Sequence, residues 1–171
     1  MSAQPTDLSA ALAPAVLERF AREVAKYPAE QRQSAVIACL AIVQQALGSV
    51  SPASEHQVAQ YLGMPPIAVH EVTTFYNMFN QQPVGRYKFN VCTNLPCQLR
   101  GGQSALEHVC QRLGVPEGGT TADGVFTVQK SECLGACADA PVLLVNDRQM
   151  VSFMSPQRLD ELIQALRSEP V

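Results

Sequence analysis

Four of the six cysteines form two close pairs, Cys92 with Cys97 and Cys133 with Cys137. Four residues separate the members of the first pair, and three separate the members of the second. Each pair follows a run of residues typical of a β-strand, so we expect each pair on a loop at the end of a strand. Thiolates are soft ligands, and four of them around one centre suit zinc or an iron–sulfur cluster.

The glycines around these cysteines favour an iron–sulfur cluster over zinc. Gly101 and Gly102 follow the first pair closely, and Gly135 lies inside the second. Backbone without a Cβ can approach bridging sulfides and offer them N–H groups. The spacing alone leaves a structural zinc site open, because such sites also use close cysteine pairs. Disulfides are less favoured, because residues 1–15 have no signal-peptide features and cytosolic thiols stay reduced.

The other reactive side chains predict no catalytic machinery. No Ser/His/Asp or Cys/His arrangement and no glycine-rich phosphate-binding loop is recognisable in the sequence, so we expect no catalytic residues and no complete active site in this chain. His56 and His70 stand alone on predicted helices and are expected at the surface or at helix ends. Cys39 and Cys110 fall on apolar helical faces, where a free cysteine packs as a small hydrophobic residue.

Composition excludes two classes of function. The net charge is −3 and no basic run is present, so we expect no nucleic-acid binding. The longest apolar stretch, residues 35–43, is far shorter than the ~20 residues that cross a bilayer, so we expect no direct membrane insertion. Only 16% of the residues are charged, against a usual ~25%, which suggests that partners cover part of the surface.

Apolar residues in the first half recur at helical spacing and predict a helical bundle behind a flexible tail. Its centre, residues 35–43, is apolar on every side, as in a helix that lies in the middle of a bundle or also faces a partner. The aromatic run at residues 75–79 is expected in the core, with a docking surface as the alternative. The expected segments are a tail over 1–11 and helices over about 14–28, 32–47, 52–63 and 66–79.

The second half changes to a period of two after the break at residues 81–85. The sequence therefore predicts an α+β protein: a helical bundle over 1–82 and an α/β domain with a four-stranded mixed sheet over 83–171. A turn at Asn146-Asp147 is expected to connect the last two strands. The expected strands are 87–92, 125–130, 142–145 and 150–153, with helices over about 106–113 and after Ser155.

Three segments, residues 91–102, 120–127 and 132–141, closely resemble the thioredoxin-like [2Fe–2S] ferredoxin family. Residues 61–76 are similar to family members that serve bacterial NADH:quinone oxidoreductase, respiratory complex I. The resemblance covers nearly the whole chain from about residue 25 to 165, and all four cysteine positions of the family pattern are filled. It implies a thioredoxin-like fold for the second domain.

The resemblance also implies the site and its role. Cys92 and Cys97 would bind one iron of a [2Fe–2S] cluster, and Cys133 and Cys137 the other. The chain would be a non-catalytic electron carrier that exchanges one electron with the flavin of the NADH-binding subunit, so FMN and NADH would bind that partner. The large iron–sulfur subunit is a further expected partner. The implied location is cytoplasmic, peripheral on the inner membrane through the complex.

Two alternatives remain at this point. Soluble NAD-linked hydrogenases and formate dehydrogenases use an equivalent diaphorase subunit for the same electron step, although residues 64–79 favour the respiratory enzyme. The other alternative is a zinc-stabilised interaction module with no redox role. A colourless protein that contains zinc would favour this alternative, and a red-brown protein would exclude it.

Overall fold

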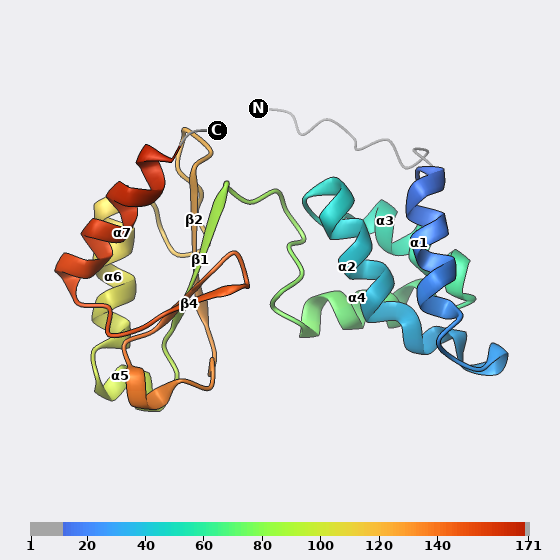
Figure 1. The fold of residues 1–171 in the computed structure, drawn as a ribbon, viewed down its shortest axis with the longest axis horizontal. Helices are drawn as coiled ribbons and strands as arrows, with labels where there is room; N and C mark the ends of the chain where they lie inside the picture. The colour runs from blue at the N-terminus through green and yellow to red at the C-terminus, as the bar shows by residue number, and fades with distance from the viewer. Residues whose placement is uncertain (1–11, 170–171) are drawn as a thin grey trace. The chain divides into compact units, whose positions relative to one another are not determined.

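The computed structural model describes residues 12–169, so the predicted tail at residues 1–11 lies outside the described part. Contacts divide the chain into two compact units, Met1–Pro83 and Val84–Val171. Helices form the first unit, and a sheet with helices forms the second (Figure 1), which confirms the predicted α+β class. That residues 1–82 and 83–171 are independent domains stays a prediction. No helix in residues 12–169 is long and apolar enough to span a membrane.

Short helices form the first unit, and some of them begin or end at capping residues that can be recognised in the sequence. Ser51 was expected to start a helix, and its Oγ accepts a hydrogen bond from the Ser54 backbone N–H at 3.2 Å. The predicted start of the preceding helix at Arg32 is wrong, because a 3₁₀ helix with a kink at Gln31 comes first. The elements are α1 (Pro14–Val24), η1 (Ala29–Ala35), α2 (Val36–Leu47), α3 (Pro52–Leu62) and α4 (Pro66–Phe75).

The core of this unit gathers around Phe20 of α1 and the inner face of α2. Cys39 is fully buried there, as predicted. Burial, with a contribution from the nearby Glu23 carboxylate, raises the pKa of its thiol to about 12. Cys39 is therefore a packing residue and does not ionise at neutral pH.

The inward stripe predicted for the fourth helix, Ala68, Val72, Phe75 and Phe79, is wrong in part. The helix buries Val69 and Thr73, whereas Ala68 and Val72 are half-buried, and Val72 packs against the core. Phe75 ends α4 with 79% of its surface exposed, whereas Phe79 is buried beyond the helix end. A threonine occupies the inward face, and this polar residue concealed the true periodicity in the sequence.

Thr73 lies inward because its hydroxyl donates a hydrogen bond to a buried carboxylate. Glu55 of α3 is 5% exposed and accepts a hydrogen bond from the Thr73 hydroxyl. Its other oxygen lies 3.0 Å from Nδ1 of His70. His70, expected at the surface or at a helix end, connects α4 to α3 while its outer edge stays exposed.

Thr73→Val is expected to lower the free energy of unfolding by about 1–3 kcal/mol, because it removes a donor from a buried carboxylate without changing side-chain shape. Chemical denaturation followed by circular dichroism measures the change. Thr74→Val is the control, because the Thr74 hydroxyl is exposed and bonds only the backbone of its own helix. Equal losses for the two variants would contradict this assignment.

The second unit contains one mixed four-stranded sheet within the described residues, in the order β2-β1-β3-β4. Strand β1 runs parallel to β2 and antiparallel to β3, and β3 pairs antiparallel with β4. The structure thus confirms the predicted mixed sheet. The elements are β1 (Tyr87–Cys92), α5 (Leu95–Leu99), α6 (Gly102–Leu113), β2 (Phe126–Ser131), η2 (Cys137–Asp139), β3 (Leu143–Val145), β4 (Gln149–Val151) and α7 (Pro156–Ser168).

Helices α6 and α7 cover one face of the sheet (Figure 1), where Phe89 of β1 and Leu143 of β3 are fully buried. The opposite side of β1 is also buried, although its residues are polar. Lys88 is only 1% exposed, and its Nζ lies 2.6 Å from Oδ2 of Asp147. Asn90 donates to the other oxygen of the same carboxylate at 2.6 Å. The strand alternation predicted β1 but did not indicate this buried polar cluster.

The hairpin turn supplies the carboxylate of that cluster. Asn146 and Asp147 both have left-handed backbones, with φ of 53° and 56°, which confirms the predicted turn. The Asn146 side chain accepts from the Lys88 backbone N–H at 2.7 Å and donates to the Arg86 carbonyl at 3.1 Å. The turn is therefore held against β1 by side chains as well as by strand pairing.

Candidate metal centre

Both cysteine pairs begin at one edge of the sheet. Cys92 is the last residue of β1, and the parallel register places it opposite Ser131, the last residue of β2. Parallel strands end at the same edge, so the loops that follow β1 and β2 emerge side by side. The first loop carries Cys97 within α5, and the second carries Cys133 and then Cys137 at the start of η2.

Hydrogen bonds join these loops directly. Two of them connect the first loop to residues 131–132, just before Cys133, and two more connect it to residues 140–142, just after Cys137. These bonds fix the approach of the two loops without using any cysteine side chain. They are Thr93 N to Ser131 O at 3.0 Å, Asn94 Nδ2 to Glu132 Oε2 at 3.1 Å, Cys92 N to Val142 O at 3.1 Å and Arg100 Nε to Ala140 O at 3.3 Å.

The structure brings all four predicted cysteines into one neighbourhood, as two pairs. Besides burial, Cys92 raises the pKa of Cys97, and Cys133 raises the pKa of Cys137. Between the pairs the thiols influence one another electrostatically. Within residues 12–169, no three His, Cys, Asp or Glu side chains are close enough together to hold one metal ion.

The two pairs differ in depth. Cys92 and Cys97 are each 1% exposed and pack with Ala140 and Val142, whereas Cys133 is exposed and Cys137 is half-buried. Burial, together with the neighbouring Cys92, raises the pKa of Cys97 to about 11. Partial burial and the charge of Cys133 also raise the pKa of Cys137. Four thiolates here therefore need a cationic centre to offset their mutual repulsion.

The donor set fits a binuclear iron cluster. All six cysteines are free thiols, and the four in question are grouped two and two, as two tetrahedral irons joined by bridging sulfides require. The start of α6 also needs a residue without a side chain. A Cβ on Gly102 would lie 2.6 Å from the Cys92 carbonyl oxygen and 2.9 Å from that of Cys97. Gly102 therefore lets α6 begin directly against the first pair.

Exposed apolar side chains surround this centre. The short helix α5 turns Cys97 inward and leaves Leu95 and Leu99 outside, the latter 80% exposed. No helix was predicted at these residues, because five residues that include a proline show no clear periodicity. Large exposed apolar groups beside a buried site are typical of a surface that a partner covers.

Phe153 is the functional candidate that the sequence did not indicate. Its backbone is left-handed, with φ of 55°, which is unfavourable for a bulky residue, yet its side chain is 50% exposed. Hydrogen bonds hold it, since its N–H donates to the Asp139 carbonyl at 2.8 Å and Ser155 N–H donates to its carbonyl at 2.9 Å. The strain presents the ring beside the second cysteine loop rather than in the core.

A recess of about 360 Å³ adjoins Phe153, between α6 and the loop that follows Cys137. Arg100, Ser104 and Pro141 line it together with the Phe153 ring, and the Ala140–Pro141 peptide bond is cis. The recess thus lies next to both cysteine loops and carries one cation.

The chain is similar to subunits of NADH dehydrogenases from several organisms. NADH-quinone oxidoreductase subunit 2 of Thermus thermophilus is 39% identical over 144 residues, which cover 84% of this chain and 80% of that protein. The NADH-quinone oxidoreductase E 2 subunit of Rhizobium meliloti is 38% identical over 151 residues, which cover 88% of each chain. The mitochondrial NADH dehydrogenase [ubiquinone] flavoprotein 2 of Dictyostelium discoideum is 36% identical, with 90% of this chain and 63% of that protein covered.

Among solved structures, an NAD⁺-reducing [NiFe]-hydrogenase in the H₂-reduced state matches with a TM-score of 0.66 at 23% identity. The match covers 80% of this chain but only 23% of the hydrogenase chain, and at this identity it supports the fold alone. The profile of the thioredoxin-like [2Fe–2S] ferredoxin family matches residues 20–167, which include all four paired cysteines. The chain therefore belongs to the thioredoxin-like [2Fe–2S] ferredoxin family.

Proposed function

We propose that the chain is an electron-carrier subunit of NADH:quinone oxidoreductase and holds one [2Fe–2S] cluster. Cys92 and Cys97 bind one iron, and Cys133 and Cys137 bind the other. The observation that carries the proposal is the convergence of two free-thiol pairs at one sheet edge in a member of this family. The names of the relatives described above support the assignment to NADH:quinone oxidoreductase.

The bound cluster supplies one-electron transfer, and the chain's own residues set its surroundings. The buried first pair keeps water from the inner side of the centre, whereas the exposed Cys133 marks the side that a redox partner can approach. No proton or group transfer is needed, so the chain acts as a non-catalytic subunit. FMN and NADH bind the partner subunit, with which this chain exchanges electrons.

The partners are the flavin- and NADH-binding subunit and, further, the large iron–sulfur subunit. The exposed Leu99 and Phe153 beside the cluster support a protein contact there. The exposed Phe75 and Ile67 of α4 support a contribution from the helical unit. Through these partners the chain is held on the cytoplasmic side of the inner membrane, as a peripheral component.

The test is electron exchange with the flavin subunit. Because all-cysteine ligation gives a low potential, the chain is reduced first with dithionite, freed of excess reductant and mixed with the oxidised flavin- and NADH-binding subunit. We expect oxidation of the cluster and bleaching of the flavin in the same time course by stopped-flow absorbance. Cys97→Ala is the matched control, because it removes one proposed ligand. A wild-type chain that leaves the flavin oxidised would exclude the proposed function.

Phe153→Asn is expected to weaken association with the flavin subunit by about tenfold, because it removes an exposed aromatic anchor. The free energy of unfolding should stay the same or rise by about 1 kcal/mol, because asparagine tolerates the left-handed backbone. Biolayer interferometry and urea denaturation measure the two effects. Met150→Asn on β4 is the control, since Met150 is exposed and apolar but has no positive φ. Equal binding by the two variants would show that Phe153 has no such role.

A further inference from the structure

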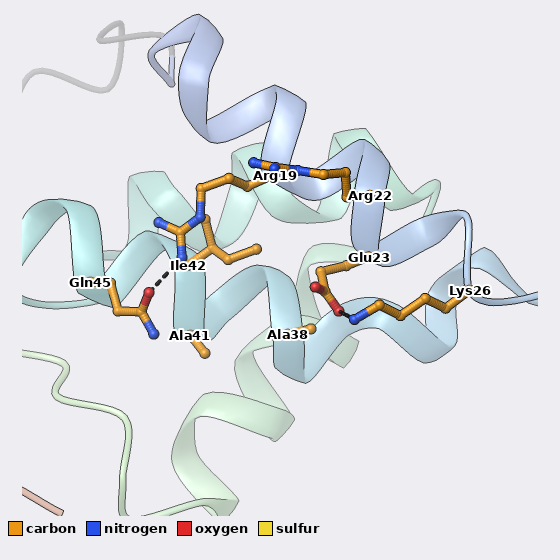
Figure 2. A pocket seen from close by; sticks show the side chains of 8 residues that line it. All are labelled: Arg19, Arg22, Glu23, Lys26, Ala38, Ala41, Ile42 and Gln45. Atoms are coloured by element: carbon orange, nitrogen blue, oxygen red, sulfur yellow. Dashed lines mark hydrogen bonds and ion pairs between the residues drawn. The ribbon is translucent and has the colours of Figure 1, made fainter.

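Helices α1 and α2 enclose a groove of about 510 Å³ on the helical unit (Figure 2). Its wall consists of long charged side chains of α1, and its floor includes Ala38, Ala41 and Ile42 of α2. The opposite side of α2 carries the fully buried Cys39 and Leu40. The sequence predicted that residues 35–43 form a helix that is apolar on every side. The groove exposes part of the apolar side of α2 that lies opposite Cys39 and Leu40.

The wall has an excess of positive charge. Arg19, Arg22 and Lys26 face a single carboxylate, that of Glu23. The Lys26 ammonium pairs with Glu23 at 2.7 Å, as the dashed line in Figure 2 shows. The Arg19 guanidinium donates to the neutral amide oxygen of Gln45, and Arg22 forms no hydrogen bond or ion pair with any of residues 12–169. Neither guanidinium therefore pairs with a carboxylate of residues 12–169, in a chain whose net charge is −3.

The spacing of these cations identifies the shape of their ligand. Arg19 and Arg22 are one helical turn apart on α1, and Lys26 lies in the turn that follows the helix, so the three cations form one stripe along the groove. One small anion cannot reach both ends of such a stripe. A second helix with carboxylates one turn apart can meet the two guanidinium groups.

The floor suits the same occupant. Ala38 and Ala41 have short side chains and lie three residues apart, so they leave a shallow channel between larger neighbours. Helices pack with their axes 8–10 Å apart when the side chains at the contact permit it. An apolar helix face could thus seat on Ala38, Ala41 and Ile42 while its flanking carboxylates meet the cationic wall.

We propose that the groove between α1 and α2 binds an acidic amphipathic helix of a partner subunit. The proposal rests on the proposed function to the extent that this chain works in an assembly, but it does not involve the cluster. It adds a contact on the helical unit whose chemistry is both electrostatic and apolar. Nucleic acid fits less well, because the chain is acidic overall and its cations here span only two helical turns.

Cross-linking in the assembled complex tests the proposal. p-Benzoylphenylalanine replaces Gln45, an exposed residue at the edge of the groove, the chain is assembled with the flavin- and NADH-binding and large iron–sulfur subunits, and the sample is irradiated. Mass spectrometry is expected to identify a helical segment of a partner that carries several Asp or Glu residues. Capture of a segment without them, capture within the same chain, or no cross-link would overturn the proposal.

Charge reversal gives a second test. Arg19→Glu with Arg22→Glu should weaken assembly by about tenfold or more and reduce its dependence on salt. The matched control, Lys130→Glu with Arg148→Glu, changes the net charge equally on the other unit and should change affinity less than about twofold. Ala41→Trp fills the groove without changing charge and should also weaken assembly. Equal affinity for wild type, the Arg19/Arg22 variant and Ala41→Trp would overturn the proposal.

The experiments distinguish failure of the groove proposal from failure of the proposed function. A wild-type chain that holds its cluster and binds its partners, beside groove variants that bind equally well, refutes the groove alone. A wild-type chain that binds no subunit of the oxidoreductase refutes the proposed function and the groove together. Circular dichroism and the electron paramagnetic resonance (EPR) signal of the reduced cluster confirm that each variant is folded.

Discussion

Replacing Cys97 with alanine is expected to remove the cluster. Iron and labile sulfide should fall from about two of each per chain to near zero. Cys97 belongs to the buried pair, which packs with Ala140 and Val142, so its loss would leave one iron with a single thiolate. Because a [2Fe–2S] cluster would need both cysteine pairs, Cys133 and Cys137 alone would not be expected to retain it. Metal analysis, sulfide determination and visible absorbance measure the loss.

Cys110→Ala is the control for that experiment. Cys110 lies on α6, is partly buried against the core of the same unit, and is a free thiol outside the two pairs. Its replacement should leave iron and sulfide unchanged. Full iron in Cys97→Ala would show that Cys97 is not a ligand. Equal loss in the two variants would indicate general destabilisation in place of lost ligation.

Asp147→Asn is expected to lower the free energy of unfolding by about 3 kcal/mol. The change removes the carboxylate that pairs with the buried Lys88 ammonium, and breaking a buried ion pair typically costs about 3–5 kcal/mol. The lower end applies because Asp147 keeps some contact with water. Asparagine tolerates the left-handed backbone at this position, so the loss reports the charge. Urea denaturation measures it.

A double-mutant cycle separates the ion pair from other effects. Lys88→Met with Asp147→Asn should cost less than the sum of the two single changes, because neither charge is then left buried. Arg148→Gln, in the same turn but exposed, is the control and should change stability by less than about 0.5 kcal/mol. Additive single changes would contradict a coupling between Lys88 and Asp147.

Local patterns in the sequence predicted much of the fold. The alternation over residues 87–92, the cap at Ser51 and the Asn146-Asp147 turn each depend on neighbouring residues and occur in the structure. The burial of Lys88 did not follow from its strand, because alternation separates two faces without indicating what covers the second. The exposure of Phe75 depended on the phase of a helical stripe, which an inward threonine obscured.

The candidate site was predictable to a similar degree. Cysteine spacing and family resemblance indicated which four thiols would come together, and the structure places the two loops that carry them at one edge of the sheet. That the four bind one cluster stays a prediction. Their unequal depth did not follow from spacing, because it depends on Val142 and Ala140, which pack against the first pair from a distant segment. Phe153 gave no sequence signal either, since its backbone is held by Asp139, fourteen residues earlier.

The decisive experiment is metal and sulfide analysis of the purified chain, combined with low-temperature EPR after dithionite reduction. About two irons and two labile sulfides per chain are expected, with a spin-half signal that is lost in Cys97→Ala. Bound zinc without sulfide and without a signal would contradict this expectation. The four cysteines would then form a structural site, and the chain would not be an electron carrier.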